Sequence, residues 1–215
     1  MIRSRYSDLT VLILTTLSSL LLAGSDAMAT PEAQFTVIEK EKDFELRRYE
    51  PQIVAQTIVE GDFAEVGNRG FRRLFDYING KNRKKVSIPM TAPVFEEIPS
   101  EKIPMTAPVN QEKENGKWVI SFIMPPEYTL ETLPEPLDPS VSLKNVPGRL
   151  VAALKYSGTW SRNRYDEKQD LLEKIIRGKG LIPIGEPFFA RYNPPWTLWF
   201  LRRNEVLIPV AKAAR

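Results

Sequence analysis

The chain has 215 residues, of which 42% are hydrophobic and 10% aromatic, and its formal net charge is +3. These proportions are typical of a folded globular protein rather than a disordered chain. The weak net charge, without a long basic tract, argues against nucleic-acid binding. The sequence contains no Cys and no His, which excludes Ser-His-Asp and Cys-His catalysis, the usual zinc sites and His-ligated haem.

The first 29 residues form a predicted signal peptide. Arg3 and Arg5 precede an apolar run, Leu9 to Ala23, and the small-x-small cleavage pattern Ala27-Met28-Ala29 follows it. The run is too short and too polar for a typical membrane span. We therefore expect a protein exported to the periplasm, with contact to a membrane only through an uncleaved signal segment. The remaining 215 − 29 = 186 residues, 30–215, are predicted to form a single domain.

The first half of this domain is predicted to be a βαββ unit. A β-rich run, Ile53 to Val59, is followed by a helix that begins after Asp62 as a plausible cap and ends near Gly80. Its apolar stripe consists of Phe63, Val66, Gly70, Leu74 and Ile78. Two further strands are predicted at Val86 to Val94 and Trp118 to Met124.

The second half follows the same plan after a Pro-rich linker, Pro125 to Pro139. A strand at Leu150 to Tyr156 precedes a helix that starts around Ser161 and ends at Gly178. The apolar residues of this helix are Tyr165, Leu171, Leu172, Ile175 and Ile176. The predicted strands that follow are Pro187 to Tyr192, Thr197 to Arg202 and Glu205 to Val210.

The two halves align at a constant spacing. Val54 falls over Val151, an offset of 151 − 54 = 97 residues, and Gly61 over Gly158. We therefore predict an α+β fold of two pseudo-symmetric βαββ repeats, about 35–124 and about 141–210, joined by the linker 125–140. The repeats should form a curved antiparallel-type sheet, a distorted barrel, flanked by two helices and leaving a groove between the halves.

A second, local duplication places the heptapeptide 88–94 (IPMTAPV) again at 103–109. Because prolines bracket both copies, we expect irregular edge strands or a hairpin in which Met fills gaps.

The MTAPV element resembles the SOUL haem-binding family, and other motifs continue the resemblance in order over nearly all of the chain after residue 29. These motifs are Glu45-Leu46-Arg47-Arg48-Tyr49-Glu50, Gly70 to Ile78, Phe122-Ile123-Met124-Pro125, Tyr128 to Pro134, Tyr192 to Thr197 and Arg202 to Val206. The resemblance implies a fold similar to bacterial effector-binding domains of the GyrI type. It also implies non-enzymatic binding or transport of haem or another tetrapyrrole.

The resemblance further implies a binding site along the first helix. Phe71 and Phe75 match apolar positions there, with Arg69 and Arg72 beside them. A porphyrin needs apolar walls and cationic groups near its carboxylates, and this helix offers both. The alternative is that the two Phe residues pack on the sheet while the arginines are solvated.

The iron ligand is left open. Met90 or Met105 could supply a thioether sulfur, and the tyrosine candidates are Tyr49, Tyr77 and Tyr192. The segments Tyr192 to Thr197 and Arg202 to Val206 are interpreted as a rigid turn and a hairpin, in which Arg202 or Arg203 could meet a propionate.

Two alternative functions are also consistent with the sequence. One is a binding module for another amphipathic small molecule. The other is a hydrolase that uses a groove carboxylate as its base, with Glu60, Glu131 or Glu205 as candidates.

Overall fold

The computed structural model describes residues 32–84, 100–114, 116–193 and 196–213. They belong to one compact unit, Pro31–Arg215. No helix within the described ranges is long and apolar enough to cross a membrane. The elements, in chain order, are β1 (Phe35–Glu41), β2 (Phe44–Tyr49), β3 (Gln52–Val59), α2 (Phe63–Ile78), β4 (Asn82–Arg83), β5 (Thr106–Glu114), β6 (Lys117–Ile123), β7 (Glu135–Pro136), β8 (Val141–Val146), β9 (Arg149–Tyr156), α3 (Arg162–Gly178), β10 (Leu181–Pro183), β11 (Phe188–Arg191), the 3-10 helix η1 (Trp199–Leu201) and β12 (Asn204–Lys212).

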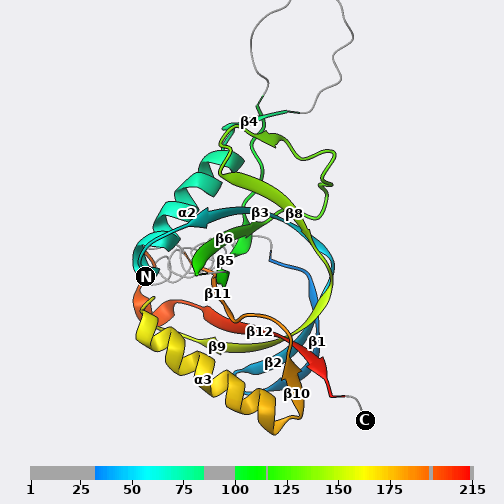
Figure 1. Cartoon of the computed structure of the whole chain (residues 1–215), viewed down its shortest axis with the longest axis vertical. Helices are drawn as coiled ribbons and strands as arrows, with labels where there is room; N and C mark the ends of the chain where they lie inside the picture. Colours follow the sequence, from blue (N-terminus) through cyan, green and yellow to red (C-terminus); the bar gives the residue numbers. More distant parts are fainter. Residues whose placement is uncertain (1–31, 85–99, 115, 194–195, 214–215) are drawn as a thin grey trace, which may run out of the picture. The chain divides into compact units, whose positions relative to one another are not determined.

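One curved sheet contains most of these strands, and both helices lie on its outer side (Figure 1). Its strands follow the order β1-β2-β9-β12-β11-β5-β6-β3-β8, with β10 paired to β12. Neighbouring strands are antiparallel, and strands from the two halves of the chain pair at β5–β11, β2–β9 and β3–β8. Because β1 and β8 are edges, the sheet is not a closed barrel. The predicted fold class is confirmed as a curved antiparallel sheet with two helices, while the internal duplication stays a prediction.

Helix α2 packs on β3 and β6 through the predicted apolar stripe. Phe63, Leu74 and Ile78 are buried. Gly70 allows a close approach, because an added Cβ there would lie only 2.3 Å from Cγ1 of Ile120 on β6. Asp62 is the N-cap residue as predicted, but its side chain makes no capping hydrogen bond.

Helix α3 begins at a capped end. The Ser161 hydroxyl accepts a hydrogen bond from the backbone N–H of Arg164 at 3.4 Å. Tyr165, Leu172 and Ile176 are buried against the sheet, whereas Leu171 is exposed. The predicted start and end of this helix are thus confirmed.

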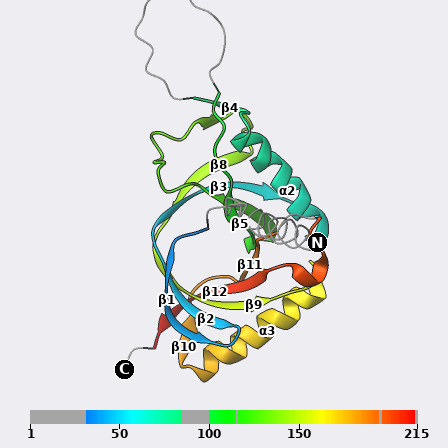
Figure 2. The ribbon, with the colours of Figure 1, turned by 180° about the vertical axis from the view of Figure 1, so that it is seen from behind.

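Apolar clusters cover both faces of the sheet. The larger cluster lies between the sheet and the helices and includes Phe122, Phe189 and Ile208. The smaller cluster lies on the opposite face, which curves inward (Figure 2), and includes Val54, Phe188 and Leu207. Because side chains alternate between the faces of a strand, the same strands supply both clusters.

Several elements differ from the sequence predictions. The predicted strand Thr197 to Arg202 is wrong, since η1 lies there. The hairpin expected within Arg202 to Val206 is also wrong, because β12 begins at Asn204, which pairs with Tyr156. Strands β1, β2, β4, β7, β8 and β10 were not predicted, and β5 was expected only over its first residues, as an edge strand or hairpin. The strand predicted at Val86 to Val94 lies outside the described residues.

The second MTAPV copy pairs with β6 from Thr106 on, but only Val109, its last residue, also pairs with β11. Strand β5, which begins at Thr106, is paired with β6 on one side and with β11 on the other. Pro108 is tolerated there because the register shifts between Thr106 and Val109, a bulge that needs no ladder hydrogen bond from proline. The first copy, with Met90, falls outside the described residues.

Candidate functional site

The outer face of α2 carries a stacked aromatic pair. The ring centroids of Phe71 and Phe75 are 5.6 Å apart, with an interplanar angle of 17°. Phe71 is half-buried and meets Phe122 of the sheet edge-on at 5.3 Å, whereas Phe75 is 44% exposed. The pair therefore extends from the core to the surface, with one ring anchored and the other open to a ligand.

The arginines of this helix point in different directions. The Arg69 guanidinium donates to the carbonyl oxygen of Glu60, in the turn before the helix. Arg73 donates to Oγ1 of Thr57 and to the carbonyl oxygen of Ile58, each at 3.3 Å. Arg72 is exposed, and its Nε lies 3.4 Å from the carbonyl oxygen of Asn68 one turn earlier. Arg72 thus remains the most available cation beside the aromatic pair.

Met105 lies at the margin of the helix-facing core. It is half-buried and packs against the same apolar cluster as Phe71. Its neighbour Ile103 is buried and donates its backbone N–H to the carbonyl oxygen of Ile78 at the end of α2. The second MTAPV copy therefore runs past the C-terminal end of the helix that carries the aromatic pair.

The three tyrosine candidates are engaged elsewhere. The Tyr77 hydroxyl donates to the carbonyl oxygen of Pro134 at 3.0 Å, and the Tyr192 hydroxyl donates to Glu205 at 2.8 Å. The Tyr49 hydroxyl accepts a hydrogen bond from Arg47 at 3.1 Å. Burial raises the pKa of all three phenols, so tyrosinate, the form that binds iron, is disfavoured at neutral pH.

A buried ionic network occupies the inner side of β2, β9 and β12. Arg47 and Glu205 have fully buried side chains and form a bidentate pair with N–O distances of 2.6 and 2.9 Å. Glu45 accepts from Arg47 Nε at 2.9 Å and from Lys155 Nζ at 2.7 Å. Arg203 adds a second cation 3.0 Å from Glu205. Charges of opposite sign alternate through the network, so each buried charge has a partner.

These contacts keep the carboxylates ionised. Burial alone would raise the pKa of Glu45, but hydrogen bonds from Lys155 and Arg47 outweigh it and lower the pKa to about 2. Burial likewise opposes ionisation of Glu205, yet Arg47 and Arg203 lower its pKa. The Glu205 carboxylate is therefore ionised and already accepts hydrogen bonds from Arg47 and Arg203, so it is not accessible as a catalytic base. Glu60 is exposed and pairs with Lys117 at 2.7 Å.

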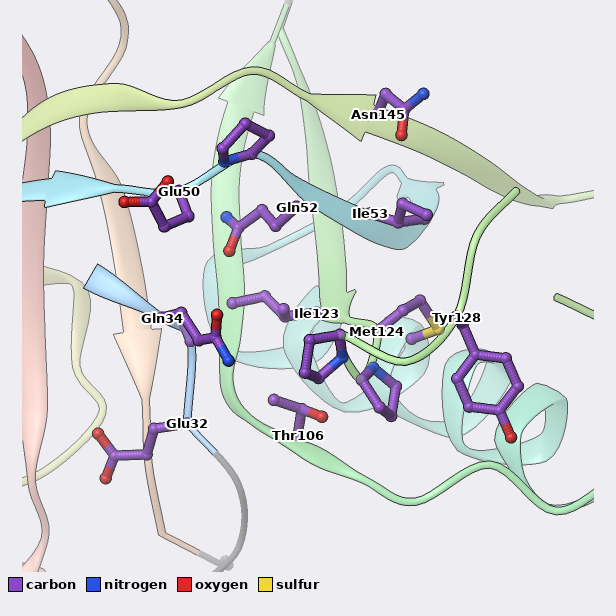
Figure 3. A pocket seen from close by; sticks show the side chains of 14 residues that line it. Glu32, Gln34, Glu50, Gln52, Ile53, Thr106, Ile123, Met124, Tyr128 and Asn145 are labelled. Atoms are coloured by element: carbon purple, nitrogen blue, oxygen red, sulfur yellow. The ribbon is translucent and has the colours of Figure 1, made fainter. Parts of the chain in front are cut away.

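A cavity of about 330 Å³ is lined by residues outside α2 (Figure 3). Gln34, Gln52 and Ile123 turn toward a common space between the segment before β1 and the ends of β3 and β6. Glu32 and Glu50 also line it, and no Lys or Arg does so among the residues that form it. Glu32 is paired with Arg203 at 2.8 Å, and the lining offers no cation to the carboxylates of a dianionic ring.

Neither this cavity nor the outer face of α2 provides a typical metal site. No group of three or more Asp or Glu side chains in the described ranges is arranged to hold a metal ion. The sequence has no His or Cys to ligate one. The exposed Phe75 ring offers an apolar contact surface to a flat amphipathic ligand. The described residues contain no preformed iron site.

The fold is shared with solved structures of low sequence identity. The C-terminal domain of EcmrR superimposes with a TM-score of 0.52 at 11% identity, over 79% of this chain and 97% of that domain. A hydrolase from Listeria innocua gives a TM-score of 0.51 at 10% identity, over 81% and 94%. At such low identities the likeness concerns the fold alone, which is of the GyrI-like class.

The sequence specifies the family within this class. Residues 30–209 match the SOUL heme-binding protein family, and the chain belongs to it. Human Heme-binding protein 2 is 28% identical over 199 residues, which cover 85% of this chain and 90% of that protein. Mouse Heme-binding protein 2 is 28% identical over 171 residues, which cover 75% and 79%. The resemblance inferred from the motifs is therefore confirmed.

Proposed function

We propose that the protein binds haem or another tetrapyrrole non-covalently on the outer face of α2, as an exported carrier or transporter without catalytic activity. The observation that carries the proposal is membership of the SOUL heme-binding protein family over residues 30–209. The two Heme-binding protein 2 relatives support the same ligand class.

The residues of α2 fit the shape and charge of such a ligand. Haem supplies a flat apolar ring, two propionates and an iron. The exposed Phe75 ring, backed by Phe71, offers an aromatic surface for the ring. Arg72 is the exposed cation on the same helix and would pair with a propionate. Arg69, held by the Glu60 carbonyl oxygen, is a second and less available one.

The iron would be held weakly or by a thioether. Met105 is the described methionine at the edge of this region, and Met90 remains a candidate from outside the described residues. Since the tyrosine hydroxyls are engaged, we propose ring contact as the main source of affinity, with Met105 as the candidate axial ligand.

Titration of the purified protein with haemin tests the proposal. A saturable Soret change at near-stoichiometric ratio is expected. Phe75→Ala should weaken binding about tenfold, since most of a buried aromatic contact is lost. Leu171→Ala is the matched control, because Leu171 is 43% exposed against 44% for Phe75 and lies on α3.

A second pair of variants tests how much the charge of Arg72 contributes to haemin binding. Arg72→Gln should weaken haemin binding severalfold, whereas Arg177→Gln, an exposed arginine of α3, should not. A flat or nonsaturable Soret response overturns haem binding altogether. Saturable binding that is insensitive to Phe75→Ala and Arg72→Gln overturns the site and leaves the ligand class standing. A changed spectrum in Met105→Leu would support axial ligation.

The cavity in Figure 3 favours a second candidate function, the binding of another amphipathic molecule. Its lining joins apolar walls such as Met124 and Ile123 to the carboxylates of Glu32 and Glu50. Such a lining suits a neutral or cationic ligand. Native mass spectrometry of the protein taken from its source cells would reveal the ligand by its mass, and a haem mass would reject this candidate.

A further inference from the structure

The loop between β11 and β12 displays an unusual run of exposed apolar side chains. Trp196 is 82% exposed, Leu198 57%, Trp199 55%, Phe200 52% and Leu201 64%. Single exposed apolar residues are ordinary on protein surfaces, but contiguous large ones mark interaction sites. The loop is therefore a candidate interaction site.

Hydrogen bonds hold the loop in shape. Leu201 donates its backbone N–H to the carbonyl oxygen of Leu198 at 2.9 Å, closing the turn of η1. The Arg202 Nε donates to the carbonyl oxygen of Thr197 at 2.8 Å. At the base, the backbone N–H of Arg203 donates to Oδ1 of Asn193 at 2.6 Å. The apolar side chains are thus presented on a structured protrusion.

The side chains project in several directions. A 3-10 helix has about three residues per turn, so Trp199, Phe200 and Leu201 point to three different sides. Each is more than half exposed. A flat protein surface could cover only one side of such a protrusion, whereas a fluid apolar phase can surround all of them. Tryptophan is also the residue that favours the boundary between lipid and water.

The charges around the loop suit an anionic surface. No Asp or Glu occurs between Glu186 and Glu205. Arg202 directly follows the apolar run, whereas Arg203 pairs with Glu205 and Glu32 and Arg191 donates to Gln111 at 3.0 Å. The Arg202 guanidinium lies 4.2 Å from the ring centroid of Trp160, at the base of the loop. Cations beside inserted aromatic residues strengthen contact with anionic headgroups.

We infer that the loop Trp196–Leu201 inserts into the surface of a lipid bilayer that contains anionic headgroups. The contact would dock the described domain on a membrane independently of the N-terminal apolar segment and of haem binding. The carriers of the interaction are the two tryptophans, with Phe200 and the leucines adding apolar area.

Vesicles of phosphatidylcholine mixed with phosphatidylglycerol test the inference with the full-length chain. Quenchers attached to the lipid acyl chains should quench Trp emission, because Trp196 and Trp199 enter the bilayer, while Trp118 stays buried and Trp160 stays half-buried against Arg202. In the double variant Trp196→Phe/Trp199→Phe this quenching should disappear. Because the N-terminal segment contains no Trp, its own binding cannot produce the signal.

Partitioning into vesicles compares the loop variant with a matched control. Trp196→Ala/Trp199→Ala should lower the vesicle partition coefficient of the loop-dependent binding at least tenfold. The control Ile182→Ala/Ile184→Ala removes residues that are 50% and 62% exposed in β10 and directly after it, and should leave partitioning unchanged. Circular-dichroism melts check that all variants remain folded.

Three results would overturn the inference. The first is wild-type Trp emission that lipid quenchers do not affect. The second is equal partitioning into vesicles of phosphatidylcholine alone, which removes the anionic headgroups from the assignment. The third is a wild-type oligomer that dissociates in the Trp196→Ala/Trp199→Ala variant without any vesicle binding, which would make the loop a contact between copies of the chain.

Discussion

The buried pair of Arg47 and Glu205 should be a major contributor to stability, and Arg47→Met tests it. The substitution keeps much of the aliphatic volume but removes the guanidinium. Two buried carboxylates, Glu205 and Glu45, then lose hydrogen bonds of 2.6 and 2.9 Å. An uncompensated buried charge is the costly outcome, because the interior solvates it poorly.

The expected loss of stability depends on the ionic contacts that Glu205 and Glu45 keep in the Arg47→Met variant. Breaking a buried ion pair from one side lowers the free energy of unfolding by about 3–5 kcal/mol. Arg203 still lies 3.0 Å from Glu205, and Lys155 still lies 2.7 Å from Glu45. We therefore expect the lower part of that range, about 3 kcal/mol, which for a domain of this size lowers Tm by roughly 10 °C.

Urea unfolding followed by circular dichroism measures the effect, with Arg48→Met as the control. Arg48 is the next residue of β2 and is exposed, so its loss should change stability by less than about 0.5 kcal/mol. The double variant Arg47→Met/Glu205→Gln should be more stable than the sum of the single effects predicts, since the orphaned carboxylate is gone. A loss below about 1 kcal/mol for Arg47→Met would refute the reasoning.

Three further predictions concern the two helices and the loss of stability at low pH. Gly70→Ala should lower the free energy of unfolding by about 1–3 kcal/mol, because its Cβ would overlap Ile120, while Gly178→Ala, with open space around it, should be neutral or slightly stabilising in the same urea assay. Ser161→Ala should cost about 1 kcal/mol through loss of the α3 cap, and an unchanged melt would contradict the capping role. Glu45 has a folded-state pKa of about 2 against the ordinary 4.5, so its stabilisation is present above that ordinary value and is lost as the pH falls toward 2. Glu45→Gln should therefore flatten the pH dependence of urea unfolding over that interval.

Much of the fold and the family follow from local sequence. The spacing of Phe63, Leu74 and Ile78 predicts the buried face of α2, because residues three and four apart share one side of a helix. The same periodicity locates α3 through Tyr165 and Ile176. The position of Phe75 just outside the buried stripe also predicts its exposure.

The sequence alone could not determine which charges are buried. Glu45 and Arg47 alternate with apolar residues along β2, a pattern typical of a strand with one solvated face. Their burial depends on pairing across the sheet, which brings Glu205 against Arg47 from 158 residues away. No local period encodes such a contact, so the ionic network was missed.

Tertiary structure likewise decided the roles of two further segments. The run from Trp196 to Leu201 has the apolar and aromatic content of a buried strand, yet no neighbouring strand is available to pair with it and it protrudes as η1. Thr106 to Pro108 has the proline of an edge strand and pairs with β6 alone among the strands, yet the same strand is flanked by β11 as well from Val109 onward. Composition sets what a segment can bury, but only the packing of the whole chain decides what lies against it.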